Sequence, residues 1–301
     1  MGGECWRTAQ QRVQPCGFSV LTKVPNELKA QPLTKRNEEL TISSFPVHCL
    51  LSKLAAEYDE RHKKTLDRLI EEIRSRLDFI GVAWVDDDED DDNSNNSAVG
   101  GDTAARANKS NGTPNRTVRL LDYACGTGVV SRALAPYTTQ CIGIDLAENM
   151  VAVYNTRAEN QGLTPSEMHA YHGNFCVPED PNPPAFASSE FFNFDIAAVG
   201  LGFHHFDDPA LVACRLAERL KTGGVLMVLD FLPHEKPDAS HPATQSITHH
   251  GFTEEHIRRI YKEAGVGKDF ALEDLATVFH YSKENGEEVK RKLFMARGTK
   301  A

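Results

Sequence analysis

The sequence predicts an α/β fold in which helices cover both faces of a doubly wound, seven-stranded, mostly parallel sheet. Three observations predict this fold. After residue 116 short apolar runs alternate with helical patterns, the last two runs flank an Asn-Gly pair, and a long amphipathic pattern precedes the alternation. Near-continuous apolar strands that alternate with helices are typical of a parallel sheet buried on both faces, and Asn-Gly between strand-like runs favours a hairpin. We therefore expect a C-terminal antiparallel hairpin and an N-terminal helical extension.

Composition divides the 301 residues into four regions. Residues 1–45 are polar, interrupted by prolines and without periodicity, so we expect a flexible arm. Residues 46–85 carry the amphipathic pattern and are predicted to be a helical extension or lid. Residues 86–116 hold an acidic run and a Ser/Asn/Gly/Thr-rich stretch with almost no apolar residues, which predicts a disordered insertion. Residues 117–301 form the main domain.

Apolar residues in the helical extension recur at three- and four-residue steps, which places them on one face of a helix. Charged residues fill the opposite face, and Gly81 is expected to end the helix. The most direct interpretation is a helix that packs on the main domain. The apolar positions are Leu66, Leu69, Ile70, Ile73, Leu77 and Ile80.

The main domain contains five strand-like runs that alternate with helical patterns, followed by two further strand-like runs that form the hairpin. The five runs are residues 118–124, 140–146, 168–173, 194–201 and 224–231, and the helices are 129–135, 147–161, 209–220 and 253–264. The hairpin strands are residues 270–281 and 289–296.

The formal net charge is −10, of which the run Asp86–Asp92 contributes seven negative charges, so the rest of the chain is only weakly acidic. This balance argues against a nucleic-acid-binding surface. The sequence has no apolar run long enough to span a membrane. Seven scattered cysteines without a Cys-x-x-Cys pair favour a reducing compartment. We expect the cytoplasm, in preference to the mitochondrion that six basic residues in the first 36 weakly suggest.

The stretch LDYACGTG, residues 121–128, follows the first strand of the main domain. In a doubly wound sheet, ligands bind beyond the carboxyl ends of the strands. Gly126 and Gly128 would let the backbone approach such a ligand closely. Asp145 ends the next strand, 17 residues beyond Gly128, where a carboxylate can accept hydrogen bonds from a ribose diol. The pattern predicts a nucleoside site.

Two features favour S-adenosylmethionine over NAD as the nucleoside. The third glycine of the dinucleotide fingerprint is missing, because Val129 and Val130 follow Gly128. Asp122 precedes the turn, where a phosphate would be repelled but a sulfonium with a free amino group would be tolerated. An NAD-dependent oxidoreductase remains an alternative.

The order of motifs LDYACGTG, GIDLAENM, GNF, DIAAVGLGFHHFDDP and LKTGGVLMVLDF resembles the class I S-adenosylmethionine-dependent methyltransferases. Within that class the chain is similar to the small-molecule enzymes grouped with ubiquinone and menaquinone biosynthesis. The resemblance covers residues 117–297 and implies a Rossmann-like methyltransferase fold with a terminal hairpin, so that residues 117–301 are the methyltransferase domain. It implies S-adenosyl-L-methionine as cofactor.

The resemblance also assigns roles around the cofactor. Ala124, Gly126 and Gly128 would cradle its methionine half, Asp122 would support the amino group, and Asp145 would hold the ribose. Asn174 stands where the family more often has Asp, near the adenine amino group, and Ala124 replaces the commoner Gly. The expected cofactor-binding residues are Tyr58, Asp122, Ala124, Gly126, Thr127, Gly128, Asp145, Leu146, Met150, Asn174, Phe175 and Gly200.

His204 and His205 follow the fourth strand, next to the expected site of methyl transfer. A histidine there could act as a general base, or it could simply shape the edge of the cofactor site. His249 and His250 could line the mouth of the substrate site, and with His241 they lack metal-binding spacing, so no metal is expected. Asn182 opens an Asn-Pro-Pro-Ala sequence that lies before the fourth strand and is interpreted as a loop.

These observations predict methyl transfer to a small molecule by in-line displacement, in which the protein mainly aligns the acceptor and excludes water. The upstream helix and residues 234–252 would cover the acceptor. The alternatives are a protein or nucleic-acid methyltransferase, an NAD-dependent oxidoreductase and a non-catalytic binding module.

Overall fold

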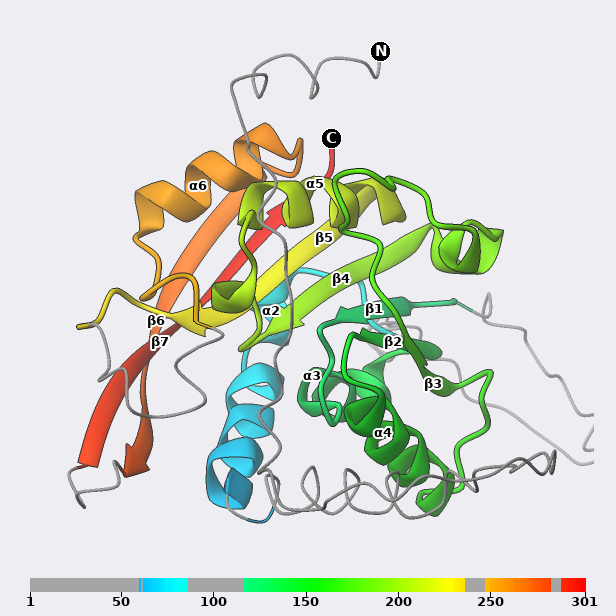
Figure 1. Cartoon of the computed structure of the whole chain (residues 1–301), viewed down its shortest axis with the longest axis horizontal. Helices are drawn as coiled ribbons and strands as arrows, with labels where there is room; N and C mark the ends of the chain where they lie inside the picture. Colours follow the sequence, from blue (N-terminus) through cyan, green and yellow to red (C-terminus); the bar gives the residue numbers. More distant parts are fainter. Residues whose placement is uncertain (1–59, 61, 86–115, 236–246, 283–287) are drawn as a thin grey trace, which may run out of the picture.

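The computed structural model describes residues 60, 62–85, 116–235, 247–282 and 288–301 of the chain (Figure 1). The predicted arm, Tyr58 and the acidic insertion up to residue 115 lie outside the described residues, as does the Asn-Gly turn of the predicted hairpin.

A seven-stranded sheet is the centre of the fold, as the sequence predicts. Its strand order is β3-β2-β1-β4-β5-β7-β6. Strands β1 to β5 run parallel, and β7 runs antiparallel to both of its neighbours, which confirms the terminal hairpin. The strands are β1 (Arg119–Tyr123), β2 (Gln140–Asp145), β3 (Met168–His172), β4 (Phe194–Gly200), β5 (Leu220–Phe231), β6 (Lys268–Ser282) and β7 (Glu288–Thr299).

Helices cover both faces of the sheet (Figure 1). On one face lie α5 and α6, and on the other lie α3, α4 and the helical residues 62–74, which continue into α2. Gly81 ends α2 in the left-handed conformation at φ 72°, and its N–H donates to the Leu77 carbonyl, as expected for a C-terminal glycine. The helices are α2 (Leu77–Ile80), α3 (Val129–Leu134), α4 (Glu148–Asn160), α5 (Pro209–Arg219) and α6 (Glu254–Glu263).

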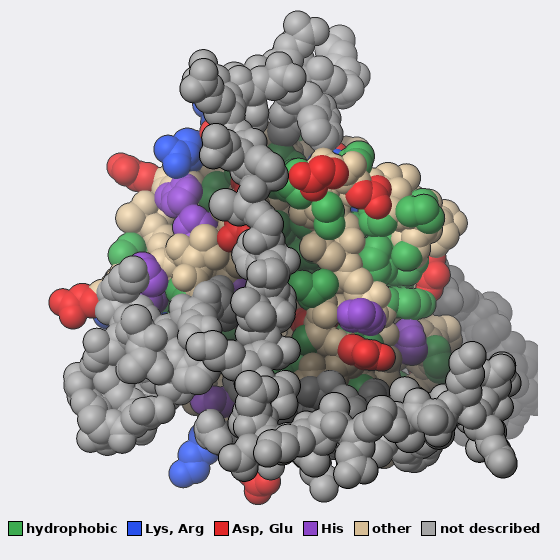
Figure 2. All heavy atoms as spheres, viewed as in Figure 1, with side chains coloured by type: hydrophobic (Ala, Val, Ile, Leu, Met, Phe, Trp, Pro, Cys, Tyr) green, Lys and Arg blue, Asp and Glu red, His purple; other side chains and the backbone are tan. Residues whose placement is uncertain are grey.

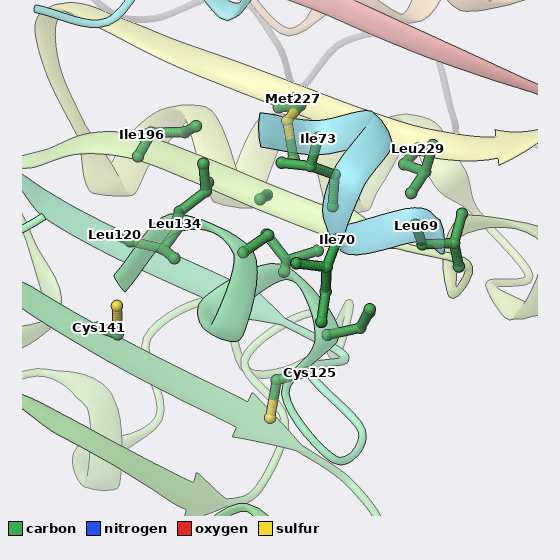
Figure 3. Close-up of a cluster of buried hydrophobic side chains, with 14 of the residues drawn as sticks. Leu69, Ile70, Ile73, Leu120, Cys125, Leu134, Cys141, Ile196, Met227 and Leu229 are labelled. Carbon is green, nitrogen blue, oxygen red and sulfur yellow. The ribbon is translucent and has the colours of Figure 1, made fainter. Parts of the chain in front are cut away.

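Each face of the sheet buries its own apolar cluster, because successive strand residues point to opposite faces. Leu120 and Met227 belong to one cluster, whereas their neighbours Leu121 and Leu226 belong to the other. Figure 3 shows Leu69, Ile70 and Ile73 of the N-terminal helical segment packed against the first cluster, beside Met227 and Leu229 of β5. The N-terminal helix is therefore part of the main hydrophobic core.

Strand order reverses at β1, which pairs with β2 on one side and with β4 on the other. The helices that follow β1 and β4, α3 and α5, consequently lie on opposite faces of the sheet. In open α/β sheets ligands bind at this point. The LDYACGTG turn lies there.

Candidate functional site

The turn after β1 contains three residues with positive φ: Ala124 at 55°, Gly126 at 52° and Gly128 at 90°. The two glycines serve different purposes. A Cβ on Gly128 would lie 2.7 Å from Cδ2 of Tyr154, so this glycine is required for packing. A Cβ on Gly126 would meet no atom within 4 Å. Gly126 therefore leaves open space beside the backbone, where a ligand can approach.

Asp145 connects the end of β2 to this turn. Its Oδ2 accepts the Gly126 N–H at 2.7 Å, and its Oδ1 accepts the Ala147 N–H at 2.8 Å. Each carboxylate oxygen has a second lone pair that can accept from a ligand hydroxyl. Leu146 follows directly and is 70% exposed, which is unusual for a large apolar side chain among the described residues. A half-exposed carboxylate beside an exposed apolar side chain suits the ribose and base of a nucleoside.

Asp122 is almost completely buried beneath the turn, at 1% exposure. Its Oδ2 accepts hydrogen bonds from the N–H and the hydroxyl of Ser131, at 3.0 and 2.7 Å, and the Tyr154 hydroxyl donates in turn to Ser131. Its Oδ1 is buried and has no hydrogen-bond partner among the described residues. Burial, with a smaller contribution from the negative charge of Asp145, raises the pKa of Asp122 to about 7, although the hydrogen bonds from Ser131 lower it. A carboxylate in this state would be stabilised by a cationic group.

Asn174 and Phe175, predicted to contact the cofactor, follow β3. The Asn174 Oδ1 accepts from the Tyr123 hydroxyl at 2.6 Å and from the Cys176 N–H at 2.7 Å. Both of its lone pairs are used, so the amide nitrogen, a donor, is the group left for a ligand. Phe175 is fully buried with its ring 4.5 Å from that of Tyr123. A contact of Phe175 with a ligand is therefore restricted to its backbone.

The remaining predicted cofactor residues surround the same crevice, except Tyr58, which is outside the described residues. Thr127 is buried, and its carbonyl accepts from Arg157 at 3.1 Å. Met150 is half-buried in the first turn of α4. Gly200 ends β4, where a Cβ would lie 2.5 Å from a methyl group of Val130, so this glycine permits close packing of the strand on α3.

At the ends of β4 and β5 the structure joins His204 to Asp230. The His204 Nδ1 lies 2.9 Å from Asp230 Oδ1, and the His204 backbone N–H donates to Oδ2 at 3.1 Å. His204 is 5% exposed and Asp230 is fully buried. The carboxylate favours the tautomer with the proton on Nδ1, which leaves the Nε2 lone pair free to accept a proton. The His205 ring lies 4.1 Å from the His204 ring but is exposed, so the two histidines have different environments.

Residues 247–252 pack onto this pair through backbone hydrogen bonds. The N–H groups of Thr248 and His249 donate to the His204 carbonyl, and the Phe252 N–H donates to Phe231. The His234 N–H donates to the carbonyl of His250, so this segment also holds the chain after β5. Figure 2 shows several histidine side chains on this face of the molecule.

The sequence interpretation did not identify Asp230 or Ser131 as site residues. Asp230 carries the same signal as Asp145, an acidic residue that ends an apolar strand, and could have been found by it. Ser131 had no such signal, because its role depends on the first turn of α3 lying over Asp122.

No group of three or more His, Cys, Asp or Glu side chains among the described residues is arranged to hold a metal ion. No helix within the described ranges is both long enough and apolar enough to span a bilayer.

Comparison with known families places residues 121–228 in the family described as "Methyltransferase domain". An uncharacterized methyltransferase of Schizosaccharomyces pombe is 29% identical over 165 residues, which cover 53% of this chain and 57% of that protein. The ubiquinone biosynthesis O-methyltransferase of Leptothrix cholodnii is 28% identical, with 36% and 41% covered. The demethylmenaquinone methyltransferase of Thermotoga maritima is 30% identical, with 38% and 44% covered. The chain thus spans about half the length of the curated relatives it matches.

Among solved structures, one chain of the Haloferax volcanii complex between the Trm112 methyltransferase activator and the putative methyltransferase superposes with a TM-score of 0.51. The superposition covers 83% of this chain and 96% of that chain at 15% identity. The likeness supports the fold assignment.

Proposed function

We propose that this chain transfers a methyl group from S-adenosylmethionine to a small molecule. Residues 121–228 match the methyltransferase family, and the curated relatives include enzymes of ubiquinone and menaquinone biosynthesis. The observation that carries the proposal is the pair of carboxylates at the glycine turn. Asp145 offers acceptor lone pairs beside the exposed Leu146, and Asp122 offers a buried oxygen that lacks a hydrogen-bond partner among the described residues. A ribose diol and an ammonium group are the ligands that such oxygens fit.

The described residues fit S-adenosylmethionine. Gly126 leaves room for the methionine half, Asp122 would pair with the amino group, and Asp145 would accept from the ribose hydroxyls. When bound, the cofactor would supply an electrophilic methyl carbon to which the acceptor's lone pair could bond, with the carbon–sulfur electron pair retained by sulfur in the neutral thioether that leaves. Pairing by Asp122 would also neutralise a carboxylate that is costly to bury alone.

His204 is the group in this site that we propose takes a proton from the acceptor. Asp230 orients its ring and stabilises the positive charge that the ring acquires, while Nε2 remains available to accept the proton. His205, in contrast, is exposed to solvent. This assignment selects one histidine from the two adjacent ones.

A small acceptor is favoured over a macromolecule for two reasons. The curated relatives include quinone-biosynthesis enzymes, and the formal charge of −10 disfavours a nucleic-acid partner. We also propose a reducing, cytoplasmic location, because none of the described cysteines Cys125, Cys141, Cys176 and Cys214 forms a disulfide.

The test is transfer of label from methyl-labelled S-adenosylmethionine to separate small-molecule, protein and RNA fractions of a cell extract. We expect labelled products in the small-molecule fraction. Label confined to protein or RNA would contradict the small-molecule proposal.

Cofactor binding is tested independently by calorimetry with S-adenosylhomocysteine. Asp145→Ala removes both backbone contacts and the ribose acceptor, and should weaken binding by about tenfold or more. Asp145→Asn, which keeps one acceptor oxygen, should lose less. Equal affinity of the wild type and Asp145→Ala would mean that the nucleoside binds elsewhere.

A further inference from the structure

A cavity of about 370 Å³ lies where the chain leaves β5 and where β7 begins, at the edge of the sheet that holds the carboxyl ends of the parallel strands. One wall is the chain after β5, Leu232–Glu235, and the other is the start of β7, Lys290–Lys292. The Leu232 N–H donates to the Lys292 carbonyl at 2.9 Å and joins the two walls. The volume of the cavity is near the lower end of the range for small-molecule binding sites, roughly 300–1,000 Å³. The cavity can hold a metabolite but not a macromolecule.

The lining of this cavity is cationic although the chain as a whole is acidic. Lys290, Arg291 and Lys292 are three consecutive bases, and Glu235 is the one acid among the described residues that line the cavity. Arg291 is 7% exposed, and its guanidinium stays charged under all ordinary conditions. The Lys292 ammonium lies 3.3 Å from Asp274, but both side chains are largely exposed, so that pair is weak. Among the described residues that line the cavity, three basic side chains thus stand against one acidic side chain.

His234 provides the cavity with a hydrogen-bond acceptor. Its Nδ1 lies 2.9 Å from the Glu235 carbonyl oxygen, so this nitrogen carries the proton and donates. The Nε2 is then a lone-pair acceptor, and it is buried without a hydrogen-bond partner among the described residues. Burial and the neighbouring positive charge of Arg291 lower the pKa of His234, which keeps the ring neutral.

The Phe231 ring connects this cavity to the catalytic histidine. It lies 5.1 Å from the His204 ring and 5.8 Å from the His234 ring, and the Arg291 guanidinium lies 5.3 Å from its centre. Arg291 of the cavity lining and His204 therefore contact the same buried ring, so one aromatic side chain separates the cavity from the proposed base.

We infer that this cavity binds the methyl acceptor through an anionic group, a carboxylate or a phosphate, held by Arg291 with Lys290 and Lys292. The nucleophile of the acceptor lies at the opposite end, beside His204, and the Nε2 of His234 accepts a hydrogen bond from a hydroxyl or amine of the ligand. The inference rests on the proposed methyl transfer and narrows its substrate class to anionic small molecules.

The test is titration of the full chain with anions while the His234 ring is observed by NMR in histidine-labelled protein, with the signal assigned by His234→Gln. The probes are inorganic phosphate, 4-hydroxybenzoate and the neutral 4-hydroxybenzamide, which matches the benzoate in shape. We expect a saturable shift with either anion and none with the amide, and the stronger anion identifies the head group. Equal binding of amide and benzoate, or no shift with any probe, would overturn the inference.

Three variants sharpen the result. Arg291→Gln should weaken anion binding by about tenfold or more. The matched control is Arg258→Gln, because Arg258 also lies over a phenylalanine ring, 4.4 Å from the centre of Phe270, but on α6 and far from the cavity lining. The double variant Lys290→Gln/Lys292→Gln removes two exposed charges and serves if Arg291→Gln fails to fold. Unchanged anion affinity in both cavity variants would contradict the inference.

The titration is made with and without S-adenosylhomocysteine, whose own affinity is measured by calorimetry. Anion binding without nucleoside binding would refute the proposed methyl transfer and leave an anion site. Nucleoside binding without anion binding would refute the substrate class alone.

Discussion

Two carboxylates at the glycine turn have unlike environments and, for that reason, unlike tasks. Asp145 accepts two backbone N–H groups at the surface of the crevice. Asp122 is buried, with Ser131 as its hydrogen-bond donor on one oxygen and no described donor on the other. An ammonium group would provide the missing partner and would convert an unfavourable buried charge into an ion pair. Cofactor binding should therefore be linked to proton release at Asp122.

The first prediction is a pH dependence of S-adenosylmethionine binding. Because the pKa of Asp122 is about 7 in the folded chain, the carboxyl is protonated at lower pH and must release its proton to pair with an ammonium. Affinity should rise as pH increases through about 7 and then level off. Calorimetry in buffers of different ionisation enthalpy measures the released proton. Asp122→Asn should abolish both the pH dependence of the affinity and the proton release. The same raised pKa contributes folding stability below the ordinary Asp pKa, and this contribution is lost as pH rises through about 7.

The second prediction separates the adjacent histidines. His204→Gln should lower kcat by about 10²- to 10⁴-fold with little change in cofactor affinity, since it removes the proposed base. Asp230→Asn should lower kcat as well and alter the pH profile, because the ring loses its orienting carboxylate. His205→Gln is the matched control and should retain most activity. An equal loss in both histidine variants would argue that they shape the site together.

At the scale of elements, the turn after β1 has one glycine for packing and one for ligand access. The third prediction follows from this difference. Gly128→Ala should destabilise the chain by more than about 2 kcal/mol, since the new methyl group meets the Tyr154 ring at a strained φ. Gly126→Ala should cost only about 1 kcal/mol, for the positive φ alone, yet should weaken cofactor binding severely. Thermal unfolding and calorimetry of both variants check the two effects, and normal binding by a folded Gly126→Ala would contradict the assigned role.

The strand boundaries show where the apolar pattern of the sequence predicts a strand correctly and where it does not. The apolar runs predicted each strand because both faces of the sheet are buried, so hydrophobicity marks nearly every strand residue. Strand β5 begins at Leu220, four residues before the predicted start. Leu220 pairs with Phe194, but the polar residues between Leu220 and the apolar run hide this part of the strand from the hydrophobic pattern. Strand β7, Glu288–Thr299, likewise begins one residue before and ends three residues after the predicted strand 289–296.

The candidate site was predictable where its residues are close in sequence to a glycine signal. The turn and the acidic ends of β1 and β2 were found in this way. The His204–Asp230 pair joins residues 26 positions apart, and it forms because β4 and β5 are neighbours in the sheet. The cationic cavity was missed for the same reason, since Arg291 reaches His234 only through the antiparallel return of β7.

At the scale of the whole molecule, the described N-terminal helices are tied to the C-terminal strands. Arg76 pairs with Glu273 of β6 at 2.9 Å, and Arg297 of β7 donates to the Ile80 carbonyl at 3.2 Å. The helical residues 62–74 also fill the same cluster as β5. The extension should therefore unfold together with the sheet, although its sequence pattern alone would also suit a separate lid.

The fourth prediction tests whether the N-terminal helix and the sheet unfold as one unit, with one substitution on each face of the sheet. Ile73 of the N-terminal helix and Ile260 of α6 are fully or almost fully buried in different clusters. Ile73→Val and Ile260→Val should each lower the free energy of unfolding by about 0.5–1.5 kcal/mol. In the double variant the two losses should add to within about 0.5 kcal/mol, because the sheet separates the two sites. Calorimetry should show one transition in all variants. If Ile73→Val instead split off a second, earlier transition, the N-terminal helix would be an independent unit, because only then could it unfold while the sheet remains intact.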